Sequence, residues 1–435
     1  MWPGIGRARM TLATAADTTA SRGWYASLDP EGRRAFWAAF LGWGLDAFDF
    51  MVFPFALSAI ATTFALTARE AGALVTVTLL VSAVGGVLAG WLADRIGRAR
   101  TLQLTVLGYA VCTFAAGWAR TYEQLLVFRA AQGFGFGGEW AAGALLVAET
   151  VRPEHRGRVL GIVQSAWAVG WAAAAVAYTA IFSFLEPVLA WRVLLWLGLT
   201  PALLALYVRR AVHEPPVFRA QGHGTGGGWL ALFRRPWART TVFAALLAIG
   251  AQGGYYSAFT WLPTYLRRAH GLSVLDTGAY TGVVILGSFL GYVTGGYLHD
   301  RLGRRATFAL FALGSGGLLP LYALAPPRGH LALLVLGLPL GFCASGMFSG
   351  FGSYLAELYP TAIRGAGQGF VYNVGRGIGA LFPTLVGALA GRLGLPEALA
   401  FGAVAYALCL LALRYLPETR GVALGSAPPA VTPGG

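Results

Sequence analysis

Long apolar stretches alternate with short polar segments along the whole chain. Each apolar stretch has about 20 residues or more, enough to cross the hydrocarbon core of a bilayer as an α-helix. None of them alternates polar and apolar residues as the strands of a membrane β-barrel do. The pattern therefore predicts an all-α integral membrane protein with twelve transmembrane helices. We place these helices at 36–64, 71–93, 101–119, 123–148, 159–184, 188–208, 240–265, 278–299, 306–325, 331–356, 366–391 and 398–416.

The composition excludes an ordinary soluble domain. Of the 435 residues, 57% are hydrophobic and only 11% are charged, whereas soluble domains carry roughly 25% charged residues. No polar stretch is long enough to build a separate catalytic domain, so we do not expect an enzyme.

Several functions are excluded by which residues are present. All 32 basic residues are arginines, and without lysine the chain has neither a Walker A loop nor a retinal Schiff base. The arginines are scattered through short loops, so nucleic acid is not an expected partner. Three dispersed cysteines form neither a disulfide framework nor a metal site. We therefore expect no cofactor and no metal.

Arginines are divided unevenly between the two sets of loops. With the N-terminus placed inside, the inner segments hold 23 arginines and the outer loops hold 7, while Arg129 and Arg376 fall within spans. Because cytoplasmic loops are rich in basic residues, we expect a multi-pass protein of the inner (plasma) membrane with both termini in the cytoplasm. The expected divisions are an N-terminal tail (1–34), a six-helix bundle (35–208), a Gly-rich linker (209–239), a second six-helix bundle (240–416) and a C-terminal tail (417–435).

The two halves of the chain repeat two short motifs. GGVLAGWLADRIGR at 85–98 aligns with GYVTGGYLHDRLGR at 291–304, and eight of the fourteen positions are identical. ETVRPEHRG at 149–157 matches ELYPTAIRG at 357–365. Because the motifs fall at equivalent places in both halves, they predict two six-helix repeats related by an axis along the membrane normal.

The repeated pattern GxLxDRxGR resembles the signature of the major facilitator superfamily, and RAAQGFGFGGEW at 129–140 resembles the span-4 motif of that family. The resemblance covers nearly the whole chain. It implies a transporter that works by alternating access around a midplane site without ATP. GLDAFDF at 44–50, GGEW at 137–140 and WLPTYL at 261–266 resemble bacterial proton symporters for organic acids, including sialate, other metabolites and aromatic acids.

Three acidic residues lie well inside spans: Asp46, Asp49 and Glu139. A charge at the bilayer centre costs roughly 2.5–3.5 kcal/mol, so we interpret these acids as candidates for proton coupling. Counting the helical rise places Asp49 at the depth of Arg129 and Asp46 at the depth of Glu139. We expect Arg129 to pair with Asp49 and one acid of the three to carry the proton. A static Arg–Asp pair beside a water-facing acid is the alternative.

Arg376 is the one basic residue deep in a span of the second half, and it shares a helix face with Asn373. A guanidinium forms paired hydrogen bonds to a carboxylate, so Arg376 is expected to bind an anionic substrate. Snorkelling toward the membrane surface or capping of carbonyl groups is the alternative. Further substrate-binding candidates, which could also be packing residues, are Arg129, Gln164, Gln252, Tyr255 and Tyr256.

The charged residues of the repeated motifs form the expected cytoplasmic gate. Gly97 and Gly303 permit tight turns, Asp94 can accept hydrogen bonds from a helix N-terminus, and Arg98 can pair with Glu149. These residues either hold the outward-open state closed on the inside or only set the topology. The expected members are Asp94, Arg95, Arg98, Glu149, Arg156, Asp300, Arg301, Arg304, Glu357 and Arg364.

A glycine cluster at 133–138 satisfies GxGxxG, but no strand precedes it and no acidic ribose ligand follows. We interpret these small residues as a surface that lets the fourth span approach a neighbouring helix. The sequence as a whole favours a proton-coupled uptake symporter for a small organic anion, with a proton-driven exporter or a carrier of sugars or other neutral solutes as alternatives. The expected partners are the small-molecule substrate, protons and the lipid bilayer, and the expected state is a monomer.

Overall fold

The structure is a computed structural model that describes residues 24–211, 214, 229–272, 274–324 and 330–424. These residues are predominantly helical and contain no β-strand, so the predicted all-α fold is confirmed. Among them, ten helical segments are long and apolar enough to cross a membrane. The other two predicted spans, α4 and α5, are also helices. Much of the predicted linker and of both predicted tails lies outside the described residues.

The first half of the chain supplies seven α-helices and two short 3-10 helices, which cover the first six predicted spans. The α-helices are α2 (Pro30–Thr63), α3 (Ala68–Ile96), α4 (Arg98–Ala116), α5 (Tyr122–Thr150), α6 (Arg156–Phe184), α7 (Pro187–Trp196) and α8 (Pro201–Ala211), and the 3-10 helices are η1 (Pro153–His155) and η2 (Leu197–Leu199).

The second half has more interruptions within its spans. Its helices are η3 (Trp229–Phe233), α10 (Trp237–His270), α11 (Val274–Leu302), α12 (Arg304–Ala323), α13 (His330–Gly346), η4 (Met347–Gly350), α14 (Phe351–Leu358), α15 (Arg364–Gly379), α16 (Phe382–Leu393), α17 (Leu395–Phe401) and α18 (Val404–Leu413).

Four predicted spans consist of two successive α-helices rather than one, and in two of these spans a short 3-10 helix lies between the α-helices. The breaks fall at glycine or proline, as between α15 and α16, where Gly379 ends one helix and Pro383 lies in the first turn of the next. Proline has no amide hydrogen to donate, and it is tolerated in a first turn because that donor has no partner there in any case. Sequence reasoning predicted the length of these spans but not the breaks within them.

Several helices begin or end at residues that favour a helix end. The Thr67 side chain and Glu70 form a capping box that starts α3. Gly97 and Gly303 have φ angles of 108° and 97°, which glycine adopts readily, and each reverses the chain in one residue between two spans. The tight turns predicted from the repeated motif are confirmed.

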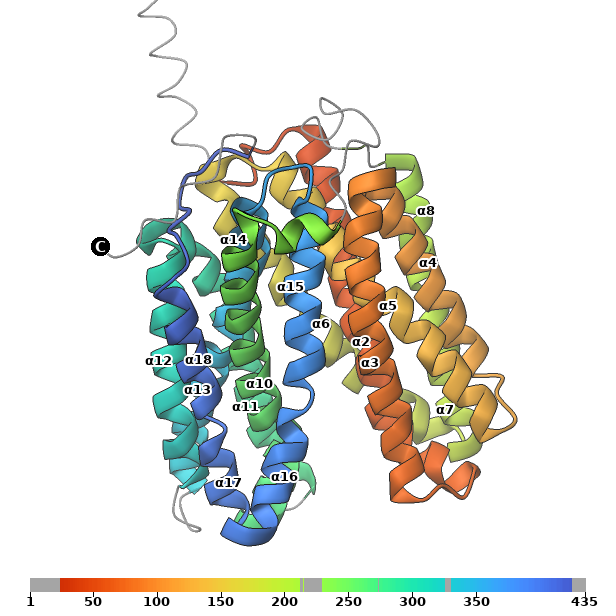
Figure 1. Ribbon diagram of the computed structural model, residues 1–435. Coiled ribbons are helices and arrows are strands. Elements are labelled where there is room, and N and C mark those ends of the chain that lie inside the picture. Colours follow the sequence, from red (N-terminus) through yellow and green to blue (C-terminus); the bar gives the residue numbers. More distant parts are fainter. Residues whose placement is uncertain (1–23, 212–213, 215–228, 273, 325–329, 425–435) are drawn as a thin grey trace, which may run out of the picture.

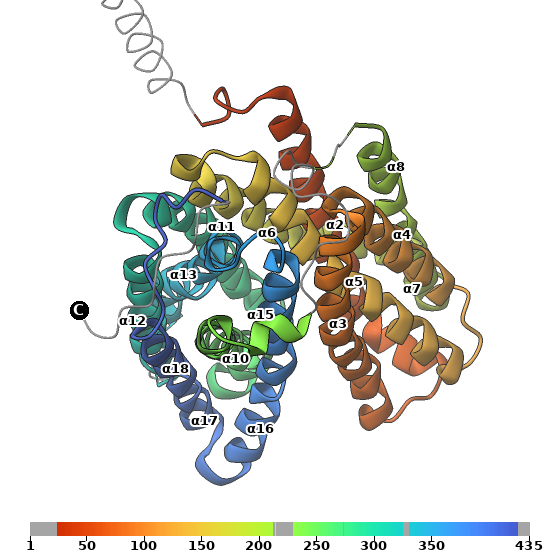
Figure 2. The same ribbon diagram turned by 45° about the horizontal axis from the view of Figure 1, so that its top comes forward.

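The helices are arranged in two groups that lie side by side (Figure 1). α2–α8 make up one group and α10–α18 the other, and the view in Figure 2 shows the same division. The main contacts between the groups are α6 against α11 and α3 against α15. In each contact, the second predicted span of one half packs against the fifth predicted span of the other half. The junction therefore has an approximate twofold symmetry.

The glycine cluster of the fourth span brings α5 close to α3. A Cβ atom added to Gly133 would overlap the backbone of Thr78, and one added to Gly137 would overlap the backbone of Ser82. The prediction that these small residues allow close helix packing is confirmed.

Candidate functional site

Two clusters of buried ion pairs lie at one end of the helix bundle, the upper end in Figure 1, which we term the ion-pair end. In the first cluster, Glu149 of α5 contacts Arg98 at 3.0 Å and Arg364 at 2.8 Å. Asp94 of α3 contacts Arg98 at 3.1 Å and accepts hydrogen bonds of 3.0 and 2.8 Å from two backbone amides at the start of α15. The first cluster therefore ties α3 and α5 to the other half.

The second cluster repeats this arrangement with the halves exchanged. Glu357 of α14 contacts Arg304 and Arg156, both at 2.8 Å. Asp300 of α11 contacts Arg304 at 3.0 Å and accepts hydrogen bonds of 2.8 and 2.9 Å from two amides at the start of α6. Carboxylates are favoured at helix N-termini, where amides point outward and the helix dipole is positive.

Eight of the ten predicted gate residues thus meet in two clusters, and the predicted Arg98–Glu149 pair is present. Arg95 and Arg301 are exposed and take no part in these ion pairs. The Arg95 guanidinium lies 4.1 Å above the ring of Trp91 instead. Each of these two arginines directly follows the clustered aspartate on its helix, and a step of one residue turns the side chain about 100° away from the junction.

Two acidic residues of these clusters were missed by sequence reasoning. Glu214 accepts hydrogen bonds of 2.7–3.3 Å from three amides at the start of α4, and Glu418 accepts bonds of 2.8 and 2.9 Å at the start of α12. Burial raises the pKa of Glu214, and the amide hydrogen bonds act in the opposite direction. The sequence offered one clue to both residues: each acid is adjacent to a proline just after the last predicted span of its half.

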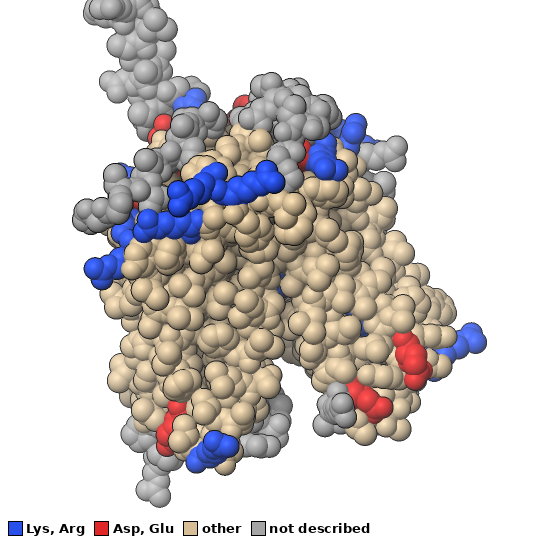
Figure 3. Space-filling view, in the orientation of Figure 1, with Lys and Arg blue, Asp and Glu red and all other residues tan. Residues whose placement is uncertain are grey.

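A central cavity of about 480 Å³ lies between the two halves, within the range of sites for small organic ligands. Its walls reach Val75 near the start of α3 and Thr384 in the first turn of α16, at the end opposite the ion-pair end. Figure 3 shows a cleft between the two lobes at that end, while arginines gather at the ion-pair end. The structure is closed at the ion-pair end and open at the other.

Arg376 of α15 lines this cavity. Its side chain is 3% exposed, and its guanidinium carbon lies 4.9 Å from the ring centroid of Phe136 and 5.3 Å from that of Tyr372. The Nη1 atom has no hydrogen-bond partner among the described residues, and no ion pair joins Arg376 to an acid there. A buried guanidinium without an anion leaves charge-assisted hydrogen bonds unmade, which an anionic ligand can form.

The four other predicted residues that line the cavity are Gln164, Gln252, Tyr255 and Tyr256. Gln252 donates a hydrogen bond of 2.8 Å to the backbone oxygen of Tyr372 and accepts one of 3.3 Å from Tyr256. Gln164 accepts a hydrogen bond of 3.0 Å from the indole of Trp140. Each of these amides is therefore held in place by residues of its own half.

Two predicted substrate-binding residues do not line the central cavity. Asn373 is buried between α15 and α3, where a Cβ atom on Gly86 would overlap its amide, and it donates to the backbone oxygen of Gly369 at 2.9 Å. A spacing of three residues leaves Asn373 about 60° away from Arg376 around the helix, which is enough to turn it toward α3. Arg129 is buried inside the first half, 3.8 Å from the ring centroid of Phe53.

The three intramembrane acids form a buried group within the first half. Asp46 and Glu139 face each other, and the Tyr109 hydroxyl of α4 lies beside Asp46. The carboxyl groups of Asp46 and Glu139 are buried and lie within hydrogen-bonding reach of each other, and Tyr109 is within reach of Asp46. The predicted proximity of Asp46 and Glu139 is confirmed, whereas Tyr109 was missed because its helix contacts cannot be read from its sequence position.

The predicted direct pair between Asp49 and Arg129 is wrong in this structure. The amide of Gln132 lies between them: it accepts a hydrogen bond from Arg129 and donates one to Asp49. Gln132 lies three residues after Arg129 on the same face of α5, so the glutamine can reach across to α2. Sequence reasoning placed Asp49 and Arg129 at similar depths but could not see the residue between them.

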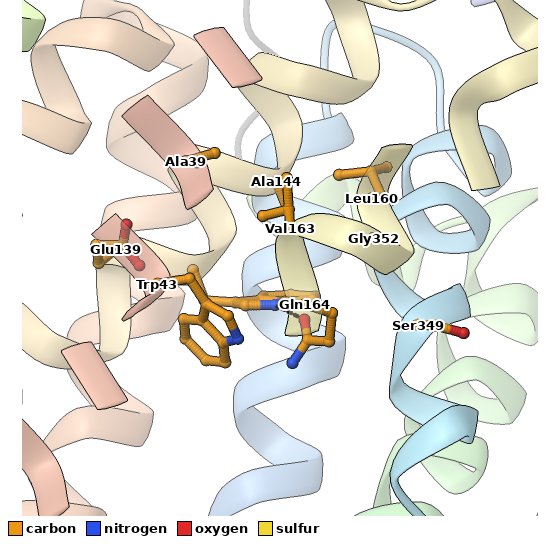
Figure 4. Close-up of a pocket in the computed structure, with 11 residues that line it drawn as sticks. Ala39, Trp43, Glu139, Ala144, Leu160, Val163, Gln164, Ser349 and Gly352 are labelled. Carbon is orange, nitrogen blue, oxygen red and sulfur yellow. Dashed lines mark hydrogen bonds between the residues drawn. The ribbon is translucent and has the colours of Figure 1, made fainter. Parts of the chain in front are cut away.

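None of Asp46, Asp49 and Glu139 lines the central cavity. Phe136 and Trp43 line it on the side of the acids, and Trp43 also contacts a second, much smaller space that includes Glu139. Figure 4 shows Glu139 and Trp43 on one side of this small space and Ser349 on the other. The ligand cavity and the acid group are thus neighbours separated by aromatic side chains.

Comparisons with known proteins agree with this architecture. The family model for the Major Facilitator Superfamily matches residues 39–327 and 271–432. The chain is 41% identical to a probable 4-methylmuconolactone transporter of Cupriavidus pinatubonensis, covering 92% of this chain and 94% of the relative. It is 33% identical to the cis,cis-muconate transport protein of Acinetobacter baylyi, over 83% of this chain and 89% of the relative.

Among solved structures, the proton:xylose symporter XylE matches with a TM-score of 0.77 and 19% sequence identity, covering 91% of this chain and 98% of that chain. At this identity the match establishes a shared fold.

Proposed function

The chain belongs to the major facilitator superfamily of membrane transporters, and from that premise we propose that it is a proton symporter for a small organic anion. The observation that carries the proposal is Arg376, a buried cation in the central cavity whose Nη1 atom has no hydrogen-bond partner among the described residues. Glu139 acts on it electrostatically, but no ion pair between the two is formed. Relatives named for transport of 4-methylmuconolactone and cis,cis-muconate support an organic acid as the substrate.

The shape and chemistry of the cavity favour a planar, unsaturated acid. Its walls carry Phe136, Trp167 and Trp171 from the first half and Tyr256 from the second. Flat aromatic side chains pack well against conjugated or aromatic ligands. The guanidinium of Arg376 can form paired hydrogen bonds with one carboxylate. Gln164 and Gln252 offer neutral polar contacts for other substituents. A ring or diene acid that places one carboxylate at Arg376 and its other polar groups at the two glutamines fits this set.

The proton is carried by the pair of Asp46 and Glu139. Two ionised carboxylates cannot donate hydrogen bonds to each other, and the one donor beside the pair is the Tyr109 hydroxyl next to Asp46. One shared proton gives the pair both a hydrogen bond and one charge fewer in a buried place. Asp49 instead accepts a hydrogen bond from Gln132, which in turn accepts one from Arg129, so Asp49 positions α2 against α5.

The two halves, 35–208 and 240–416, rock around the central cavity. The ion-pair end faces the cytoplasm, because the arginine-rich loops lie there, and both termini are cytoplasmic in the inner membrane. The two clusters then latch the inside shut in the outward-open state. The transporter works as a monomer, since one chain supplies both halves and residues of each half line the cavity. Accessibility of epitope tags at both termini in intact cells tests the orientation.

Uptake by proteoliposomes tests the function. The purified protein is reconstituted, and uptake of radiolabelled benzoate and cis,cis-muconate is followed with the outside more acidic than the inside. Symport predicts accumulation above the outside concentration that an uncoupler abolishes and that exceeds the accumulation in protein-free liposomes, where the neutral form of a weak acid crosses the bilayer unaided. Uptake that stops at equal concentrations with or without the pH gradient would refute proton coupling, and accumulation of a sugar but of neither acid would refute the substrate class.

A further inference from the structure

Two stacked aromatic rings, one from each half, lie at the base of the central cavity. Trp140 of α5 and Tyr372 of α15 have ring centroids 3.6 Å apart and planes inclined by 16°. Each residue is only 4% exposed. Stacked aromatic pairs add about 0.5–1.5 kcal/mol beyond the area they bury. Because the rings belong to different halves, the stack persists only while the halves are closed at this depth.

The rings stand between two spaces of very different size. Tyr372 lines the central cavity, whereas Trp140 lines the small space that also contacts Glu139, Ala144 and Leu160. The small space measures about 10 Å³, which is close to the minimum that holds one water molecule. Figure 4 shows Ala144, Leu160 and Glu139 around it. The ligand cavity therefore meets the small space at the stack and at Trp43 and Gln164, which line both spaces.

Side chains of the ligand cavity hold both rings in place. The Trp140 indole donates to Gln164 at 3.0 Å, and Gln252 donates to the backbone oxygen of Tyr372 at 2.8 Å. The Arg376 guanidinium lies over the Tyr372 ring. A ligand bound to these polar groups would therefore contact the same side chains that hold the two stacked rings.

We propose that the Trp140–Tyr372 stack is the inner barrier of the substrate pathway and separates the ligand cavity from the space beside Glu139. The latch clusters lie about 12–14 Å farther along α5 and α15, so the stack is a separate closure nearer the ligand. The proposal rests on the proposed function for the direction of transport, but not for the existence of the barrier. Trp140 and Tyr372 act here by excluding water and solute, not by binding the proton.

Access of a charged thiol reagent to Ala144 tests the barrier. Ala144 lies one turn, about 6 Å, beyond Trp140 toward the ion-pair end and lines the small space. Ala144→Cys is introduced into a parent in which Cys112, Cys343 and Cys409 are replaced by alanine. A membrane-impermeant methanethiosulfonate cation is then added to the periplasmic side of right-side-out membrane vesicles, without substrate and without a pH gradient.

We expect the thiol to be protected when Trp140 is present and to react at least tenfold faster in Trp140→Ala. Trp140→Phe keeps an aromatic ring in the stack and is the matched control, with protection close to that of the parent. Tyr372→Ala removes the opposite ring and should expose the same thiol, so one poorly folded variant does not decide the result.

Equal labelling rates in the parent, Trp140→Ala and Tyr372→Ala would overturn the proposal, as would Trp140→Phe reacting as fast as Trp140→Ala. Because the labelling needs neither substrate nor a proton gradient, its failure is distinct from failure of the symport proposal. A protected thiol in a protein that does not accumulate acids would leave the barrier standing and refute only the symport.

Discussion

Replacing Arg376 by glutamine should weaken binding of a carboxylate while sparing a neutral analogue of the same shape. Arg376 is 3% exposed and lies among aromatic rings with a free Nη1 atom, so a bound carboxylate would form a largely desolvated, charge-assisted pair. Loss of one partner from such a pair costs about 2–5 kcal/mol. Since about 1.4 kcal/mol is a factor of ten in affinity, the dissociation constant for benzoate should rise roughly 30-fold or more.

The assay is calorimetric titration of the detergent-solubilised protein with benzoate and with benzamide. Arg376→Lys is the matched control: it keeps the charge but loses the planar fork, so its affinity for benzoate should fall between those of the parent and Arg376→Gln. Benzamide, which carries no charge, should bind all three proteins within about threefold. Unchanged benzoate affinity in Arg376→Gln, or an equal loss for benzamide, would refute the assignment of Arg376 to the carboxylate.

Three further predictions concern the proton, the latch and the fold. Asp46→Asn and Glu139→Gln should each abolish uphill accumulation of acid while keeping substrate exchange across proteoliposomes, because the one carboxyl that remains can no longer share a proton with a second carboxylate; normal accumulation in both would remove the pair from the coupling step. Asp300→Asn weakens the bonds to the start of α6 and should lower periplasmic labelling of Thr384→Cys about fivefold or more, corresponding to roughly 1–2 kcal/mol, whereas the exposed Arg301→Ala should not; equal labelling in both would contradict the latch. Gly133→Ala should lower the melting temperature, because its Cβ overlaps the backbone of α3 and overpacking costs about 1–3 kcal/mol, while Gly108→Ala, which meets no neighbour, should not; equal melting temperatures would show that α3 can move aside.

Much of the fold was predictable, because bilayer thickness and apolar run length fix where helices cross a membrane. The repeated motif also predicted the turns at Gly97 and Gly303 and the Arg98–Glu149 pair. A motif that recurs at equivalent places in two halves is a long-range constraint that a single stretch of sequence lacks. The breaks within spans were not predictable in the same way, since many glycines and prolines in this chain lie within unbroken helices.

Sequence reasoning predicted the membrane depth of the candidate site residues, but only partly which neighbours their side chains face. Counting residues from a helix end gives depth, and this correctly brought Asp46 beside Glu139. Which neighbour a side chain faces depends on helix rotation and crossing, and here the sequence reasoning was wrong. It missed Gln132 between Asp49 and Arg129, and it assigned Asn373 to a cavity that the residue does not line.

The central claim is that acid and proton cross together, and the most direct measurement is the acid gradient at which net flux stops. Proteoliposomes are preloaded with labelled cis,cis-muconate, and the outside concentration that gives no net movement is found at several pH differences with the membrane potential clamped at zero. Coupling predicts that the inside-to-outside ratio of acid at zero flux shifts about tenfold per pH unit for each proton carried. A ratio that stays at one across all pH differences would contradict the account.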